Sequence, residues 1–420
     1  MTLSIFEIAA LLLLLSGFFG WVNHALFRLP HTIGLLVMAL VASLALLGLE
    51  KLVPGLGVTE TLQAAIGQID LYSTVMEGML AFLLFAGALH VDFTWLRSQA
   101  WAIGLMASVG VLTSTAIVGV GLFYLAQLLG QPIPFIWALI FGALISPTDP
   151  VAVLSLLKSI NVPHALEAKI AGESLFNDGV GVVVFSILLT IALSTGSTEV
   201  TALQVGELFV VEALGGALLG LVTGFVAYRI MATMDEHMLE ILLTLGIVTA
   251  TYAVALRLHL SGPIAVVVAG LLIGNRGADV AMSDSTRTSM FSFWELIDEI
   301  LNSVLFLLIG LEVLVISLDP SFGWLAAATI PLVLVARFIA VSLPILTLSL
   351  RKAFAPGAIP VLTWGGLRGG ISVALALSLP AIDEKPLLLA CTYAVVLFSI
   401  VVQGLTVKRV VNATVDPTLV

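Results

Sequence analysis

Long apolar stretches separated by short polar segments run along nearly the whole chain. A membrane-spanning helix needs about 20 mainly apolar residues, and repeated stretches of this kind predict about thirteen transmembrane helices. The predicted spans cover residues 3–20, 32–49, 71–90, 101–129, 134–157, the stretch that carries 172–179 and continues to 193, 203–228, 238–256, 261–274, 291–318, 324–350, 359–379 and 386–407.

Composition supports an integral membrane protein of the all-α, polytopic class. The chain has 420 residues, of which 60% are hydrophobic and only 10% charged, whereas about a quarter of the residues in a soluble domain are charged. The first 20 residues lack the basic flank of a cleaved signal and are interpreted as a retained span. A single cysteine, Cys391, excludes an internal disulfide and a cysteine metal cluster.

Lysines and arginines are distributed unequally between the two sets of predicted loops. One set carries eleven of them: Arg28, Arg97, Lys158, Lys169, Arg229, Arg276, Arg287, Arg351, Lys352, Lys408 and Arg409. The other set carries three: Lys51, Arg257 and Lys385. Basic loops stay in the cytoplasm, so we expect the N-terminus outside, the C-terminus in the cytoplasm, and a prokaryotic inner membrane as the location.

The strongest polar signal is Gly-Glu-Ser-Leu-Phe-Asn-Asp-Gly at 172–179, which lies within a long apolar stretch. Ionisable groups at membrane depth are costly and usually mark an ion or proton path. On a helix, Ser174 and Asp178 stack one turn apart, and so do Glu173 and Asn177. The first pair could supply oxygen ligands to a cation, and the second could support it. The alternative is hydrogen bonding between packed helices, for which four polar groups in six residues are more than needed.

Two predicted spans contain interruptions. Ser-Pro-Thr-Asp-Pro at 146–150 cannot continue a regular helix through both prolines, and its Thr148 and Asp149 add a hydroxyl and a carboxylate. Gly-Gly-Leu-Arg-Gly-Gly at 365–370 puts four glycines around Arg368, which could neutralise the negative ends of facing helices. A simple proline kink and a glycine-packed crossing are the alternatives. Paired interruptions in the two halves of a chain instead indicate an inverted-repeat transporter with a site at the membrane midplane.

Other charged residues fall inside predicted spans. Arg337 lies deep in the eleventh span and needs an acidic partner, for which we choose Glu173. Glu77 is an isolated acid in the third span and a candidate outer-shell group of the cation site. One face of the tenth span is acidic and could line a funnel that attracts cations; the residues on it are Glu295, Asp298, Glu299 and Asn302.

Taken together, these motifs resemble the monovalent cation:proton antiporter-1 family, specifically NhaP-type sodium/proton antiporters of prokaryotes. The resemblance rests on 146–150, 172–179, Arg337 and 365–370. It implies a thirteen-helix inverted-repeat fold with two crossed discontinuous helices, and a homodimer. The chain would then be one integral membrane domain, with scaffold and dimerisation helices at 1–100 and 203–318, core transport helices at 101–202 and 319–411, and a short cytoplasmic tail at 412–420.

The resemblance also assigns roles to individual residues. Asp178 matches the carboxylate that binds the transported ion, and Thr148 and Ser174 match the other sodium ligands. Asn177 matches a structural asparagine, and Asp149 matches the acid of the unwound stretch. The remaining matched positions form a core ion pair, Glu173 with Arg337.

The mechanism that we expect is competition at Asp178. Protonated, this carboxyl group is neutral; deprotonated in apolar surroundings, it needs a cation to compensate its charge. Hard cations prefer oxygen ligands. Because Asn177 stands beside it instead of a second acid, we predict one-for-one, electroneutral exchange of Na⁺ or Li⁺ for H⁺, with a role in pH homeostasis. The alternatives are a K⁺/H⁺ exchanger, a cation channel, and an intramembrane protease with Asp149 and Asp178 as its dyad.

Several other functions are not indicated. The chain has no nucleotide-binding loop, no zinc-hydrolase or serine-hydrolase motif and no basic patch with aromatic residues. We therefore expect no enzyme activity, no cofactor beyond the transported ions, no nucleic-acid partner and no nucleotide-binding regulatory domain. Membrane lipid and a second copy of the chain are the expected partners.

Overall fold

The computed structural model describes residues 4–52, 63, 71–149, 153, 164–194, 202–278, 281–314, 320–349 and 357–414. Over these residues the chain is helical and contains no β-strand, so the all-α prediction is confirmed. The helices of the first half are α1 (Ile5–Val22), α2 (His31–Leu52), α4 (Leu71–Ser73), α5 (Leu80–Leu89), α6 (Phe93–Ser98), α7 (Ala100–Leu105), α8 (Val111–Leu128), α9 (Phe135–Ile145) and α11 (His164–Leu193).

The second half is built in the same way. Its helices are α12 (Ala202–Met231), α13 (His237–Arg257), α14 (Gly262–Leu272), α16 (Asp284–Glu312), α17 (Gly323–Ser349), α18 (Ala358–Trp364), α19 (Gly370–Leu377), α20 (Lys385–Phe398) and α21 (Gly404–Thr414). Short π-helical turns interrupt or extend several helices: η1 (Asn23–Phe27), η2 (Thr74–Met79), η3 (Met106–Gly110), η4 (Ile273–Gly277) and η6 (Ser399–Gln403). A single 3₁₀ turn, η5 (Pro320–Phe322), precedes α17 in the described part of the chain.

The lengths of the helices agree with a protein that crosses the membrane many times. Within the described ranges, nine helices are long and apolar enough to span a bilayer, and the apolar helices Phe135–Ile145 and Gly262–Gly277 are shorter. The other predicted spans correspond to α16, which is rich in polar residues over its first half, and to α18 with α19, which are separated by an interruption. The number thirteen therefore stays a prediction.

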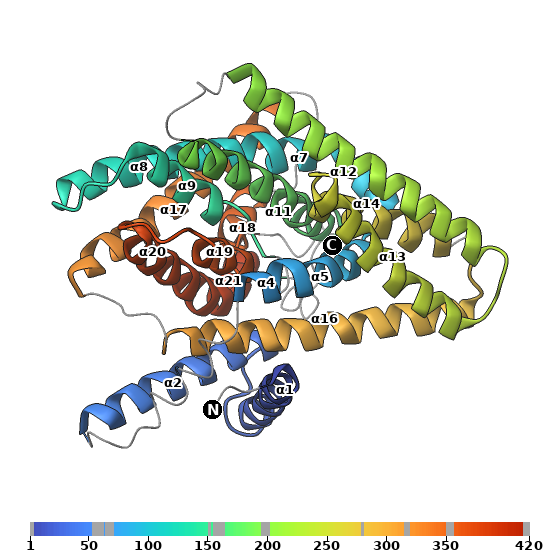
Figure 1. Ribbon diagram of the computed structural model, residues 1–420, viewed down its shortest axis with the longest axis horizontal. Helices are drawn as coiled ribbons and strands as arrows, with labels where there is room; N and C mark the ends of the chain where they lie inside the picture. The colour runs from blue at the N-terminus through green and yellow to red at the C-terminus, as the bar shows by residue number, and fades with distance from the viewer. Residues whose placement is uncertain are drawn as a thin grey trace.

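Two groups of helices stand side by side in Figure 1. The left of the view holds α8, α9 and α17 to α21, and the right holds α12, α13 and α14. Between them lies α11, which contacts α9 on one side and both α12 and α14 on the other. The long helix α16 runs beneath both groups and packs against α2, α5 and α13. The predicted division into scaffold and transport core also stays a prediction.

Both interruptions predicted from the sequence are present, and they cross. The first break, residues 146–149, follows the end of α9, and the second break, residues 365–369, separates α18 from α19. At the crossing, the Asp149 N–H donates to the Leu367 carbonyl over 2.8 Å, which forms an isolated antiparallel bridge. Pro150 lies outside the described residues. Unwound backbone at membrane depth must be buried in protein or line a cavity, and here each break covers the other.

Candidate cation site at the crossed breaks

Asn177 on α11 holds the first break in place. Its side-chain carbonyl accepts a hydrogen bond from the Thr148 N–H over 3.2 Å, and its Nδ2 donates to Thr148 Oγ1 over 2.7 Å. One amide side chain thus satisfies the backbone donor and the hydroxyl of the same unwound residue. An aspartate at this position could accept from the N–H but, when ionised, could not donate to the hydroxyl.

The oxygen groups of the predicted cation site come together beside this contact. Thr148 Oγ1 and Ser174 Oγ lie 3.0 Å apart in a hydrogen bond. Asp178 is one helical turn beyond Ser174 on α11, as the spacing predicts, and its side chain is 4% exposed. No hydrogen bond from the described residues to the Asp178 carboxylate is found, and the charged groups that act on it are Asp149 and Arg368. A buried acid that has no hydrogen bond from the described residues can take up a proton or a cation.

Arg368 in the second break reaches the first. Its Nη1 donates to the carbonyls of Ser146 and Pro147, the latter over 2.9 Å, at the carboxyl end of α9. That end carries partial negative charge from its unpaired carbonyls, so the buried guanidinium neutralises it. Gly369 allows the backbone of the second break to approach Asp149 closely, because a Cβ atom at this position would overlap the Asp149 carboxylate.

Arg337 has an equivalent contact at the second break. The guanidinium forms a bidentate ion pair with Glu173 on α11, the partner that the sequence suggests, with Nη2 to Oε2 at 2.9 Å. Its Nη2 also donates to the Leu362 carbonyl over 3.0 Å, near the carboxyl end of α18. A Cβ atom at Gly366 would overlap this guanidinium. The ion pair therefore ties α11 and α17 to the end of a broken helix.

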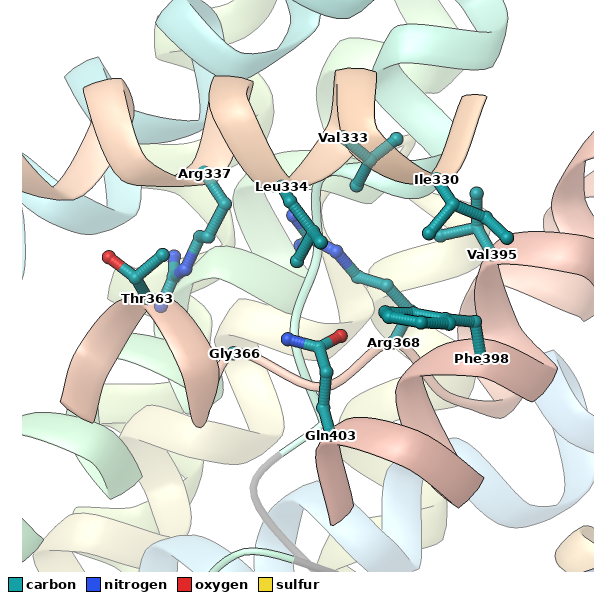
Figure 2. Close-up of a pocket in the computed structure, with 10 residues that line it drawn as sticks. All are labelled: Ile330, Val333, Leu334, Arg337, Thr363, Gly366, Arg368, Val395, Phe398 and Gln403. Carbon is teal, nitrogen blue, oxygen red and sulfur yellow. The ribbon is translucent and has the colours of Figure 1, made fainter. Parts of the chain in front are cut away.

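The last helix adds two side chains that the sequence analysis does not single out. Ser399 and Gln403, at either end of η6, both bond to the second break. In Figure 2, Gln403 points from η6 toward the stretch around Gly366, and Arg337 reaches toward Thr363 from the opposite side. A small cavity, about 10 Å³ in volume, lies between them. The available signal was a serine and a glutamine four residues apart in an apolar span.

The structure places the other predicted residues on η2 and α16. Glu77 is on the π-helical turn η2 with an exposed side chain, next to Met76, whose carbonyl accepts a hydrogen bond from the Tyr252 hydroxyl. On the acidic face of α16, Asn302 Nδ2 donates to Asp298 Oδ1 over 3.0 Å. Glu299 lines a groove of about 340 Å³ between α1, α2 and α16.

Lys169 is a correction to the predicted loops. It was expected in a cytoplasmic loop, but α11 begins at His164, and the Lys169 side chain is 4% exposed within that helix. The reason is that the helix starts about two turns before the apolar stretch that identifies the sixth span. The lysine thus occupies the same helix as Glu173, one turn earlier.

The donor set at the first break consists of oxygen atoms. Among the described residues there is no group of three or more histidine, cysteine, aspartate or glutamate side chains that could hold a metal ion. The oxygens at hand are hydroxyl, carboxylate and carbonyl groups, which hard cations prefer.

Comparison with known proteins identifies the family. The family model described as "Sodium/hydrogen exchanger, transmembrane" matches residues 10–413. The chain belongs to the sodium/hydrogen exchanger family. The resemblance to the monovalent cation:proton antiporter-1 family seen in the sequence is thereby confirmed.

Individual relatives that align with nearly the whole exchanger support this assignment. The Na(+)/H(+) antiporter NhaP of Pseudomonas aeruginosa is 48% identical over 97% of this chain and 96% of its own length. The Na(+)/H(+) antiporter NhaH of Halobacillus aidingensis is 36% identical over 92% of each chain. The structure of the sodium proton antiporter MjNhaP1 from Methanocaldococcus jannaschii superimposes with a TM-score of 0.73 at 19% identity, over 96% of both chains. The predicted antiporter fold is therefore confirmed.

Proposed function

We propose that this exchanger moves Na⁺ or Li⁺ against H⁺ across the membrane, one cation for one proton, by alternating access to a single site at Asp178. Relatives that match almost the whole chain are named Na(+)/H(+) antiporters, which supports Na⁺ as the cation. The observation that carries the proposal is the buried Asp178 carboxylate, which has the hydroxyl of Ser174 one helical turn away and no hydrogen bond from the described residues.

Competition at this carboxylate couples the two fluxes. A buried carboxylate is unfavourable while charged and uncompensated, so it is occupied either by a proton or by a cation. Thr148 and Ser174 would supply hydroxyl oxygens to the cation, and their mutual hydrogen bond keeps the two oxygens 3.0 Å apart. Because the two occupied states exclude each other and both neutralise Asp178, the loaded site can cross the membrane barrier in either form.

Neighbouring residues would support the site without carrying the exchanged ions. Asn177 is neutral and both ends of its amide are used on Thr148, so it adds no second charge, which supports electroneutral exchange. Glu173 and Arg337 compensate each other. Arg368 would hold the first break, Asp149 would add negative charge beside Asp178, and Glu77 would belong to an outer shell.

The membrane context is also a proposal. The bias of lysines and arginines toward one set of loops supports an external N-terminus and a cytoplasmic C-terminus. We propose a homodimer in a prokaryotic inner membrane, in which 1–100 and 203–318 form the scaffold and 101–202 and 319–411 form the moving core. Its cellular role would be pH homeostasis.

Flux measurements on purified protein in liposomes test the proposal. Vesicles with a pH gradient and a lumenal pH dye receive pulses of Na⁺, Li⁺ or K⁺, with and without a clamped membrane potential. We expect Na⁺ and Li⁺ to dissipate the gradient at a rate that the clamp does not change, and Asp178→Asn to abolish the response. Asp235→Asn removes an acid on an exposed turn between α12 and α13 and should behave as wild type.

The contrary outcomes separate the alternatives. A response to K⁺ alone would keep antiport but change the cation, and a rate that follows the clamp would exclude electroneutral exchange. A steady single-channel current in a planar bilayer would indicate a channel. Transport by Asp178→Asn at the wild-type rate would contradict the assignment of the site.

A further inference from the structure

The last helix of the core contacts the second break through a π-helical turn. This turn, η6, separates α20 from α21, and its first and last residues are Ser399 and Gln403. Both side chains are buried. π-Helical turns are rare and frequently occur at functional sites, so two buried polar side chains on such a turn require an explanation.

These two side chains satisfy backbone groups at opposite ends of the second break. Gln403 Nε2 donates to the carbonyl of Trp364, the last residue of α18, over 3.1 Å. At the other end, the Arg368 N–H donates to Ser399 Oγ over 2.9 Å. Neither backbone group has a helical partner, because the chain is unwound here. At membrane depth a side chain must take the place of that partner, since bulk water is excluded.

A third hydrogen bond joins the end of α18 to the last helix. Trp364 Nε1 donates to Thr406 Oγ1 over 2.8 Å, from the end of α18 to α21. The end of α18 is thus held at both its backbone carbonyl and its side chain by consecutive turns of the last helix. The second break and the last helix form one connected unit.

Through Arg368 this unit reaches the proposed cation site. The Arg368 backbone is held by Ser399, and its guanidinium holds the Ser146 and Pro147 carbonyls of the first break. Next to it, the Leu367 carbonyl accepts from the Asp149 N–H. Any rotation of residues 365–369 would therefore displace the first break, where Thr148 lies.

We infer that Ser399 and Gln403 are positioning residues for cation binding, because they hold the second break in the orientation in which Arg368 caps the first. This inference rests on the proposed function and deepens it. Neither residue touches the cation. They act through Arg368 and Leu367 on the spacing between the first break and α11, and so on the apparent affinity for Na⁺.

The chain provides a matched control for the serine. Thr392 on α20 is also buried on the last helix, but its Oγ1 donates to the Leu388 carbonyl of its own helix over 2.7 Å. Thr392→Val therefore removes a buried hydroxyl of similar environment without touching the second break. Ser399→Thr keeps a hydroxyl at the critical position and is the conservative rescue variant.

The test compares Na⁺ titrations of proton exchange in liposomes for wild type, Ser399→Ala, Ser399→Thr, Gln403→Met and Thr392→Val, with thermal unfolding of each protein in detergent. Loss of one neutral hydrogen bond between the last helix and the second break should raise KM for Na⁺ about three- to tenfold in Ser399→Ala and Gln403→Met. Their maximal rates should stay close to that of wild type. Ser399→Thr and Thr392→Val should keep the wild-type KM, whatever their melting temperatures.

Three results would overturn the inference: an unchanged KM in both Ser399→Ala and Gln403→Met, a lower maximal rate at constant KM, or an equal rise of KM in Thr392→Val. If Ser399→Ala does not fold, Gln403→Met decides alone. A wild-type protein that exchanges Na⁺ for H⁺ while the variants keep its KM contradicts this inference only. A wild-type protein that exchanges neither ion contradicts the proposed function and this inference with it.

Discussion

The two crossed breaks have one feature in common but differ in their chemistry. Each follows the carboxyl end of a helix, and an arginine donates hydrogen bonds there: Arg368 to two carbonyls at the end of α9, and Arg337 to the Leu362 carbonyl near the end of α18. The first break is serine, proline, threonine and aspartate, whereas the second is three glycines with a leucine and an arginine. The first therefore offers oxygens to a cation, and the second offers positive charge to the first.

The state of the polar groups at the two breaks differs as well. At the second break, backbone groups without a helical partner bond to the side chains of Ser399, Gln403 and Arg337. At the first break, Thr148 is bonded to its neighbours, but the Asp178 carboxylate beside it has no hydrogen bond from the described residues. Side chains thus hold the backbone of the second break in place, although Arg368 Nη2 and Thr363 Oγ1 there are buried without a hydrogen-bond partner among the described residues. A buried acid without a hydrogen bond from these residues is open to a proton or a cation. We take the second break as the support and the first as the exchange site.

The largest expected effect comes from the ion pair that ties α11 to the second break. Removing one partner leaves a buried charge uncompensated, so Arg337→Ala and Glu173→Gln should each lower the free energy of unfolding by about 3–5 kcal/mol. Unfolding in detergent micelles measures this. The double variant Glu173→Gln with Arg337→Met leaves no unpaired charge and should be more stable than either single variant. Wild-type stability of both single variants would show that the pair does not support the break.

A smaller effect is expected where α11 holds the first break. Asn177→Ala removes two hydrogen bonds and leaves the buried Thr148 N–H without an acceptor, which should cost about 2–3 kcal/mol in unfolding free energy. Thr190→Ala, on the same helix, removes a more exposed hydroxyl that bonds to Ser186 of its own helix, and serves as the control. Equal losses in the two variants would contradict a specific role of Asn177 at the break.

The glycines of the second break should tolerate no side chain. A Cβ atom at Gly366 or Gly369 would overlap the Arg337 guanidinium or the Asp149 carboxylate, and overpacking of this kind typically costs about 1–3 kcal/mol. We expect Gly366→Ala and Gly369→Ala to lose stability and flux. Gly104 lies in a helix, and a Cβ atom there would meet no neighbouring group within 4 Å, so Gly104→Ala should be neutral or slightly stabilising. Wild-type flux in both break variants would contradict the close contact.

The smallest effect concerns a turn remote from both breaks. Hydrogen bonds from Ser283 and Thr286 hold the pKa of Asp235 below its usual range. Because the folded-state pKa is depressed, the stabilising contribution is present above the unfolded value of about 3.9 and is lost as pH falls through the folded pKa. Asp235→Asn should therefore lower the melting temperature slightly at neutral pH, and the difference from wild type should vanish in acid. A difference that grows on acidification would contradict this sign.

Much of the fold and of the site could be predicted because charge inside an apolar stretch is conspicuous. Asp178, Arg337 and Arg368 stand out in this way, and two unpaired charges at core depth suggest the Glu173–Arg337 pair. The prolines and glycines likewise mark the breaks. The antiporter fold was implied by the family resemblance that these motifs carry, and it is confirmed by the superposition on MjNhaP1.

Other features could not be predicted from the sequence, for physical reasons. Ser399 and Gln403 are neutral, and a neutral polar residue in a span bonds to its own helix as readily as to a neighbour, as Thr392 does. The π-helical turns have no characteristic amino-acid composition by which the sequence would reveal them. The burial of Lys169 depends on where α11 begins, and helix ends are the least well predicted positions.

Proton release on cation binding tests the central claim most directly, since it requires no transport. Na⁺ is added to purified wild-type protein and to Asp178→Asn in weakly buffered detergent solution, and the released protons are measured with a pH dye. If proton and cation compete for one carboxylate, wild type should release up to about one proton per bound Na⁺ at a pH where Asp178 is protonated, and the variant none. Undiminished release from Asp178→Asn would contradict a site in which Asp178 carries the exchanged ions.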